Sequence, residues 1–161
     1  MKLTANFMLS EFEKSDVANY HAIDNSVRDS AVISRITLLC KKVLQPFREY
    51  LRCPVIISSG YRCRQLNELV GGVETSQHIG GFAADIVPSY YGGWMCRDIA
   101  WLVCNCSFDQ LIIYPTFMHV SYVGLSSNRH KLLFSDKVDI DYKTRIYRAI
   151  TDAVLDMKRD S

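Results

Sequence analysis

Two histidines and an aspartate in the second half of the chain have the side-chain types that bind metal ions. His78 and Asp85 stand in TSQHIGGFAADI, separated by two adjacent glycines, and His119 follows in FMHVSYV. Two imidazoles and one carboxylate, with a fourth position open, are the ligand set of a catalytic zinc site. The alternative interpretation is a turn that leads into a strand, with Asp85 as a hydrogen-bonded polar residue at its edge.

The strand pattern determines whether these three residues can meet. DQLIIY and FMHVSYV indicate two strands joined at Pro115 and Thr116, which predicts a hairpin. Side chains alternate along strands, so His119 is expected to face the same side as Ile112. A strand FAADIV beside this hairpin would bring Asp85 to the two histidines. A lone histidine in an apolar strand is more often a core residue, so the metal interpretation depends on this pairing.

The remaining segments predict an α+β domain, with a small, largely antiparallel sheet that carries the zinc site and is flanked by helices. Ser10 and Glu13 form an S-x-x-E capping box, which predicts a short helix from about Glu11. A long amphipathic helix is expected from about 29 to 51, with a kink at Pro46. Further strands are expected in PVIISSGY and FAADIV, and further helices in CRQLNELVGG, in WMCRDIAWLVCN and from about 142 to 157.

The composition fits a single domain over residues 1–161, long enough to bury a core without disulfides. The net charge is only +2, with both signs scattered along the chain. A nucleic-acid partner is therefore not expected, because such binders carry a basic face or stripe. The apolar stretches end well short of the roughly 18 residues that cross a bilayer, so no membrane partner is expected either. The chain is expected to act as a monomer.

The N-terminus and the cysteines suggest a reducing environment. MKLTANFMLSEFEKSD lacks the apolar core of a secretory signal peptide, so we expect cytoplasmic synthesis without an export signal. The six cysteines are accordingly expected to be reduced. Cys96, Cys104 and Cys106 lack the paired C-x-x-C spacing of a zinc knuckle, and are expected to be small buried apolar residues.

Several stretches resemble the D-Ala-D-Ala carboxypeptidase family of zinc metallopeptidases, which is related to the vancomycin-resistance dipeptidase and the hedgehog signalling domain. The similarity is greatest to the small peptidase domains of bacteriophages and bacteria. It extends from about residue 7 to 122, which leaves 123–161 as a C-terminal extension. The matching segments are SGYR (59–62), LNELVGGVETSQHIGGFAAD (66–85), FDQLI (108–112) and HVSY (119–122). The signature S-x-H-x-x-G-x-A-x-D is complete, with Ser76, His78, Gly81, Ala83 and Asp85.

The resemblance implies a role for each residue of the site. His78, Asp85 and His119 would bind Zn²⁺. Arg62 would bind a carboxylate of the peptide substrate, for which the rigid guanidinium fork is suited, and Ser76 would hydrogen-bond the substrate backbone. The alternative roles are a surface arginine and a turn-forming serine. The implied partner is a peptidoglycan stem peptide, and a phage-encoded enzyme would reach it in the cell wall after release, without an export signal.

The base that a zinc peptidase requires is not evident in this sequence. It takes a proton from the attacking water and returns it to the leaving amine. Relatives place an acidic residue three positions before the last histidine ligand or directly after DQLII, where this chain has Thr116 and Tyr114. Phenols are poor bases at neutral pH, so Tyr114 is expected to face the metal and donate to a developing oxyanion. Asp109 is the nearest candidate base, although strand alternation turns it away from His119, and Glu74 is a second candidate.

Two functions therefore remain open. The first is a zinc-dependent peptidase acting on cell-wall stem peptides, which we favour because Arg62 and Ser76 accompany the complete set of ligands. The second is a domain that retains zinc and binds peptide without cutting it, a case that the hedgehog signalling domain resembles. A carboxylate on the metal-facing side of the sheet would distinguish the two.

Overall fold

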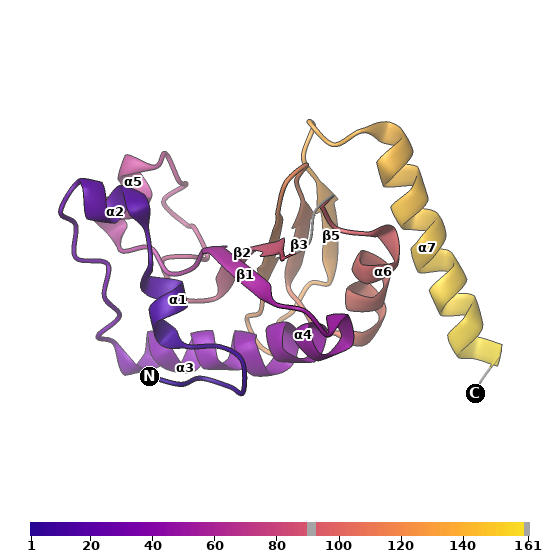
Figure 1. The fold of residues 1–161 in the computed structure, drawn as a ribbon, viewed down its shortest axis with the longest axis horizontal. Coiled ribbons are helices and arrows are strands. Elements are labelled where there is room, and N and C mark those ends of the chain that lie inside the picture. Colours follow the sequence, from indigo (N-terminus) through magenta and orange to yellow (C-terminus); the bar gives the residue numbers. More distant parts are fainter. Residues whose placement is uncertain (90–92, 160–161) are drawn as a thin grey trace.

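The computed structural model describes residues 1–89 and 93–159, which form one five-stranded sheet flanked by helices (Figure 1). The order of strands across the sheet is β1-β2-β4-β3-β5. Neighbouring strands are antiparallel, except for β3 and β5, which are parallel. The predicted α+β class with a largely antiparallel sheet is confirmed. The strands are β1 (Val55–Ser59), β2 (Ala83–Pro88), β3 (Gln110–Ile113), β4 (Met118–Ser121) and β5 (Lys131–Phe134).

The register of the central strands aligns one row of side chains across the sheet. Ser59 of β1 pairs with Asp85 of β2, Asp85 pairs with His119 of β4, and His119 pairs with Ile112 of β3. Because directly opposed residues in a sheet point to the same face, Asp85 and His119 emerge side by side. The predicted pairing of Ile112 with His119, and of a strand carrying Asp85 beside the hairpin, is confirmed.

The hairpin turn fixes the register between β3 and β4. Ile113 pairs with Met118, and the backbone N–H of Tyr114 donates to the carbonyl of Phe117 at 3.0 Å. The loop between these last paired residues therefore consists of the two predicted residues, Pro115 and Thr116. An additional residue here would turn every side chain of β4 to the opposite face.

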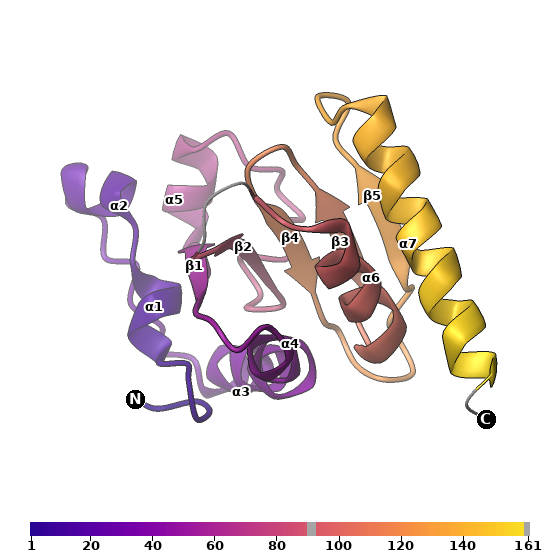
Figure 2. The same cartoon turned by 45° about the vertical axis from the view of Figure 1, so that its right-hand side comes forward.

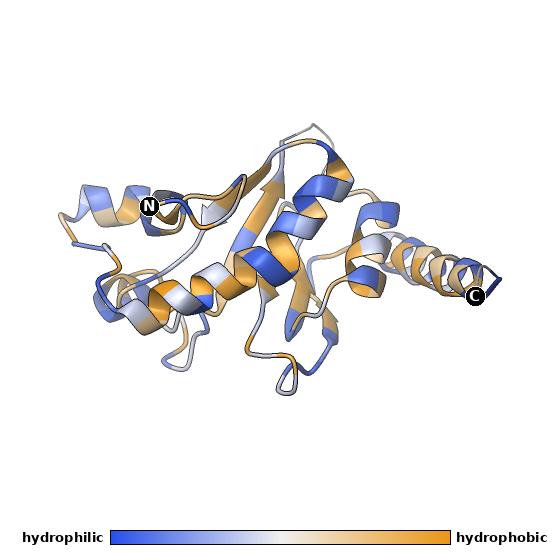
Figure 3. Cartoon of the chain, turned by 90° about the horizontal axis from the view of Figure 1, so that it is seen from below, coloured by the Kyte–Doolittle hydropathy of each residue, from blue (hydrophilic) through white to orange (hydrophobic). Residues whose placement is uncertain are grey.

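The long helical segment beneath the sheet has three parts: α3 (Ser30–Leu39), a π-helical turn η1 (Cys40–Leu44) and α4 (Gln45–Leu51). The predicted helical segment is present. A kink was predicted at Pro46, and the structure has a π-helical turn just before that residue instead. The N–H of Gln45 donates to the carbonyl of Cys40, five residues back. A proline ring clashes with the carbonyl four residues before it, and the wider turn provides room for that carbonyl. Figure 3 shows polar and apolar bands alternating along this segment.

The core lies between this helical segment, the sheet and α6 (Cys96–Asn105). Phe47 of α4 is fully buried, and its ring centroid lies 5.4 Å from that of Trp94 and 6.2 Å from that of Trp101. The C-terminal helix α7 (Ile140–Arg159) packs against α6 at the β5 edge of the molecule (Figure 2). Its predicted amphipathic pattern is consistent with Ile146, which is fully buried.

The N-terminal region differs from its prediction in detail. Helix α1 (Leu9–Glu13) begins two residues before the expected Glu11. The carboxylate of Glu11 accepts the N–H of Met8 at 2.6 Å, so Glu11 caps the helix where Glu13 was expected to do so. Glu13 instead accepts the N–H of Val27 at 2.8 Å, because its position at the helix end faces that loop. Helix α2 (Asp16–Tyr20) was not predicted, and α5 (Arg64–Leu69) matches its prediction.

All six cysteines are free, as expected. Of the three that were expected to be buried, Cys106 is buried, whereas Cys96 and Cys104 are partly exposed. Burial raises the pKa of the Cys106 thiol to about 12, which makes it unreactive near neutral pH. Within residues 1–89 and 93–159, no helix has the length and apolar character needed to cross a bilayer.

Removal of the Phe47 ring tests this description of the core. Phe47→Ala should lower the free energy of unfolding by about 3–5 kcal/mol, because it leaves a cavity beneath two tryptophans. Urea titration measures the change. Tyr20→Ala, at a position 87% exposed, is the matched control and should stay within about 0.5 kcal/mol of the wild type. Equal stability of the two variants would contradict the assignment of Phe47 to the core.

Candidate metal centre

The row of side chains on β2, β4 and β3 opens into a cleft of about 640 Å³. This volume is typical of sites that bind small ligands or short peptide segments. The loop that carries the signature sequence forms one wall, and the hairpin forms the other. The cleft is lined by Arg62, Gly72, Val73, Thr75, Ser76, Gln77, His78, Asp85, Gln110, Ile112, Tyr114, Phe117, His119 and Arg129.

His78 is held in one orientation by the backbone beside it. Its Nδ1 donates to the carbonyl oxygen of Gly60 at 2.6 Å, because a carbonyl can only accept. The proton on Nδ1 leaves the lone pair of Nε2 directed into the cleft. Gly60 lies so close to α1 that a Cβ there would stand 2.5 Å from the Cα of Phe12. The glycine therefore allows the carbonyl to reach the histidine.

Gly81 provides the turn between His78 and β2. Its φ is +72°, and a Cβ at this position would lie 2.8 Å from the side chain of Val32 on α3. Both the left-handed backbone and the close approach to the helix require glycine. This glycine therefore allows the chain to turn tightly between His78 and β2.

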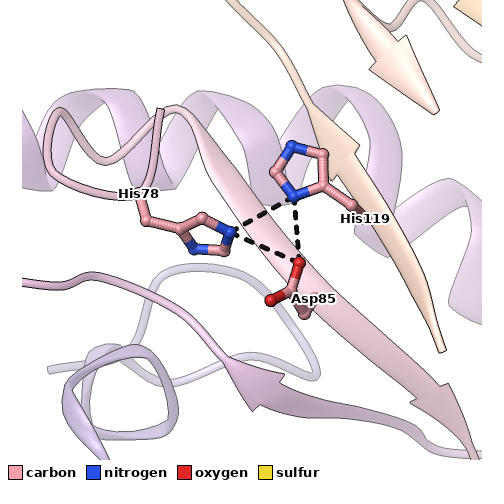
Figure 4. A group of neighbouring side chains, drawn as sticks. All are labelled: His78, Asp85 and His119. Atoms are coloured by element: carbon pink, nitrogen blue, oxygen red, sulfur yellow. Dashed lines mark hydrogen bonds and ion pairs between the residues drawn. The ribbon is translucent and has the colours of Figure 1, made fainter. Parts of the chain in front are cut away.

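The three predicted ligands converge in the cleft (Figure 4). Asp85 Oδ1 lies 2.9 Å from His119 Nδ1 and 3.3 Å from His78 Nε2, and the two imidazole nitrogens lie 3.2 Å apart. His78 comes from the loop before β2, Asp85 from β2 and His119 from β4. The expected meeting of these three side chains is therefore observed.

The donor atoms suit Zn²⁺ in both chemistry and spacing. Zinc–ligand distances of about 2.0–2.2 Å place neighbouring ligands of a tetrahedral site roughly 3.3–3.6 Å apart. The three donor atoms require only a small outward movement to reach that spacing. Burial alone would raise the pKa of Asp85, but its interactions with the imidazoles of His119 and His78 outweigh burial and hold this pKa below its usual range. The carboxylate is thus ionised, as a metal ligand must be.

Arg62 and Ser76 both line the cleft beside these ligands. Arg62 Nη2 donates to Asp85 Oδ2 at 3.1 Å, and its Nε donates to the hydroxyl of Ser59 at 3.1 Å. The two oxygens of Asp85 are therefore divided between the histidines and the arginine. An outer partner of this kind orients a metal ligand and increases its affinity. The roles of Arg62 and Ser76 toward a substrate remain predictions.

Tyr114 lies in the cleft at the end of the hairpin, on the side where strand alternation places it. Its ring stacks on Phe117, with the ring centroids 4.2 Å apart. Thr116, at the other position where relatives carry an acidic residue, is exposed in the turn. Neither position provides a carboxylate.

Asp109, the candidate base, is committed to other partners. It is fully buried, and it accepts hydrogen bonds from Arg129 Nε at 2.7 Å and from the amide of Gln77 at 2.8 Å. The hydrogen bonds from Arg129 are the main reason that its pKa lies well below the usual range, against the opposing effect of burial. A carboxylate stabilised in this way is a weak base. This geometry argues against Asp109 as the group that accepts a proton.

Glu74, the second candidate base, lines a separate small cavity with Arg64 and Asn67. Among the described residues that line the cleft, Asp85 is consequently the only carboxylate. Two cleft residues, Gln77 and Arg129, were missed by the sequence analysis. Gln77 occupies a variable position of the signature, and Arg129 lies in a loop that has no recognisable pattern.

Loss of a ligand tests the metal assignment. His119→Ala should lose most of the bound zinc, because only two of the three donors remain. Elemental analysis of purified protein measures the stoichiometry, with one zinc per chain expected for the wild type. His21→Ala, an exposed histidine far from the cleft in sequence, should retain it. Full zinc content in His119→Ala would rule out the assignment.

Comparison with known proteins agrees with this geometry. The family model described as Peptidase M15 matches residues 5–121, well over half of the chain. No curated protein matches the chain. The resemblance that the sequence motifs suggested is confirmed over nearly the predicted range. Peptidases of this family are metallopeptidases that typically use zinc. With its complete set of three ligands, the chain belongs to the M15 family of peptidases.

Proposed function

We propose that this protein is a zinc-dependent peptidase that hydrolyses a peptide bond in the stem peptides of bacterial peptidoglycan. One observation carries the proposal. His78, Asp85 and His119 present their donor atoms together in an open cleft of a chain that belongs to a peptidase family. Structural zinc sites are closed by four protein ligands, whereas catalytic ones have three and an open position.

The side chains around the ligands suit peptide binding. Arg62 is fixed by Ser59 and Asp85, and a guanidinium held in this way can receive the C-terminal carboxylate of a peptide with little loss of side-chain entropy. Ser76, which also lines the cleft, would offer a hydroxyl to the peptide backbone. Bound Zn²⁺ would act as a Lewis acid toward the scissile carbonyl and the attacking water.

The described residues of the cleft include no basic carboxylate apart from the ligand Asp85, so proton transfer is expected to be slow. Tyr114 lines the cleft, and we expect its hydroxyl to donate a hydrogen bond to the oxyanion that develops on the carbonyl, but a phenol does not replace a basic carboxylate. General acid–base catalysis typically contributes about 10²–10⁴-fold to the rate. We therefore expect slow hydrolysis, supported by binding and by the metal.

A peptide-binding domain without catalytic activity is the second candidate function. It is favoured by the absence of any carboxylate other than Asp85 among the described cleft residues. Incubation of zinc-loaded protein with purified peptidoglycan, followed by mass analysis of the soluble fraction, separates the two. Released peptides that are absent with His119→Ala support the peptidase. Co-sedimentation with the wall without released peptides would reject the peptidase and favour the binding domain.

Arg62 provides a test of substrate recognition. Arg62→Ala should lower kcat/KM by about tenfold or more, the value of a lost charge-assisted hydrogen bond to a carboxylate. Arg62→Lys should also be impaired, because a single ammonium does not reproduce the planar fork. Peptide turnover is measured by chromatography, with zinc content as a check that Asp85 still functions as a ligand.

Arg64→Ala serves as the control for both Arg62 variants, because this arginine is exposed on α5 and does not line the cleft. It should leave turnover unchanged. Wild-type kinetics in Arg62→Ala would show that this arginine does not bind the substrate.

Restoring a carboxylate tests the missing base. Tyr114→Glu should raise the rate above that of the wild type by up to about 10²-fold, since it places a carboxylate on the metal-facing side of the hairpin. Tyr114→Gln has the same length without the charge and should show no gain. The measurement is the initial rate of stem-peptide cleavage at neutral pH. Equal rates in the two variants would mean that proton transfer does not limit the reaction.

A further inference from the structure

Arg129 lines the cleft, although it lies outside the part of the sequence that matches the peptidase family. It lies between β4 and β5, beyond residue 121, yet it lines the same cleft as the metal ligands. Arg62 follows β1, which forms one edge of the sheet, while Arg129 precedes β5, which forms the other. The two arginines therefore reach the cleft from opposite edges of the sheet.

Buried Asp109 holds the guanidinium of Arg129 in place. Arg129 Nε donates to Asp109 Oδ1 at 2.7 Å, Nη2 donates to Oδ2, and the backbone N–H of Arg129 also donates to Oδ1, at 3.0 Å. Gln77 donates to Oδ2 at 2.8 Å from the loop that carries His78. Side-on pairing of this kind fixes both the position and the plane of the guanidinium.

One edge of the Arg129 guanidinium remains available. The pairing with Asp109 uses Nε and one hydrogen of Nη2, which leaves both hydrogens of Nη1 and the second of Nη2. Among the described residues, the hydrogen bonds and the ion pair of Arg129 all go to Asp109, through Nε, Nη2 and the backbone N–H. The side chain is 46% exposed, while the carboxylate that holds it is 1% exposed. The inner edge of the guanidinium, Nε and Nη2, neutralises the charge of Asp109. This pairing does not use the outer edge, formed by Nη1 and the second hydrogen of Nη2.

The charge of the cleft favours an anionic ligand. Its described lining has two arginines and a single carboxylate, that of Asp85, which is already shared between the histidines and Arg62. A divalent cation at the ligands would make this surface more positive still. Arginine in a fixed orientation suits bidentate binding of a carboxylate, which it can accept on the outer edge while Asp109 occupies the inner one.

We propose that Arg129 is a specificity-determining residue that binds a second carboxylate of the peptide, distinct from the terminal carboxylate expected at Arg62. This inference rests on the proposed function, because it takes the ligand to be a peptide. The substrate class is then a peptide with at least one free carboxylate in addition to its C-terminus, and amidation of those internal carboxylates should weaken binding.

Two synthetic stem pentapeptides test the proposal with zinc-loaded protein. Both end in the same free carboxylate; in one the carboxylates of D-isoglutamate and diaminopimelate are free, and in the other both are amidated. Calorimetry measures the affinities, and mass analysis of the same mixtures measures cleavage. The wild type should bind the free peptide at least about tenfold more tightly than the amidated one.

Variants separate recognition from folding. Arg129→Ala should abolish the preference between the two peptides. Arg129→Lys should also abolish it, although its ammonium still pairs with Asp109, because a single ammonium does not provide two donor edges. Lys131→Ala, an exposed cation that does not line the cleft, should keep the preference. Zinc content and melting temperature identify any variant that has lost its fold.

Each outcome decides a different claim. Equal wild-type affinity for the two peptides, or a preference that persists in both Arg129 variants, would overturn the role of Arg129 whether or not the peptides are cut. Selective binding without cleavage would leave the role of Arg129 intact and reject the peptidase. Failure to bind either peptide would overturn both.

Discussion

The register between β2 and β4 is the constraint on which the site depends. Asp85 and His119 meet because they are directly opposed in this antiparallel pair, and a slip of one residue would turn one of them into the core. The two-residue turn at Pro115 and Thr116 sets the register of β4 against β3, and so the position of His119 in the sheet. The buried side chains that alternate with the ligands along the strands resist any slip of this register. Apolar packing on one face of the sheet therefore fixes the metal ligands on the other.

Hydrogen bonds then orient the side chains that the sheet has placed. The carbonyl of Gly60 selects the tautomer of His78, and Arg62 takes the second oxygen of Asp85. Buried Asp109 performs a similar task at the other side of the cleft, where it links the loop of His78 to the segment after β4 through Gln77 and Arg129. Asp109 is therefore a positioning residue, and its hydrogen bonds to Gln77 and Arg129 argue against a role in proton transfer.

The ligands and the hairpin were predictable from the sequence because they depend on local patterns. Strand alternation, the Pro115–Thr116 turn and the spacing around His78 each act over a few residues. The roles of Asp109 and Arg129 were not, because Arg129 lies in a loop that carries no periodic signal from which its contact with Asp109 could be inferred. Strand β5 is short and pairs in parallel with β3, and the π turn before Pro46 reflects a local steric clash; neither has a distinctive pattern.

X-ray absorption of the zinc-loaded protein tests the central claim most directly, because it reports the atoms bound to the metal. The structure predicts a four-coordinate zinc surrounded only by nitrogen and oxygen at about 2.0–2.2 Å, with the signature of two imidazoles. The chain also has six free cysteines, which are the strongest competing ligands. Sulfur at about 2.3 Å, or a shell without imidazole, would contradict a site built from His78, Asp85 and His119.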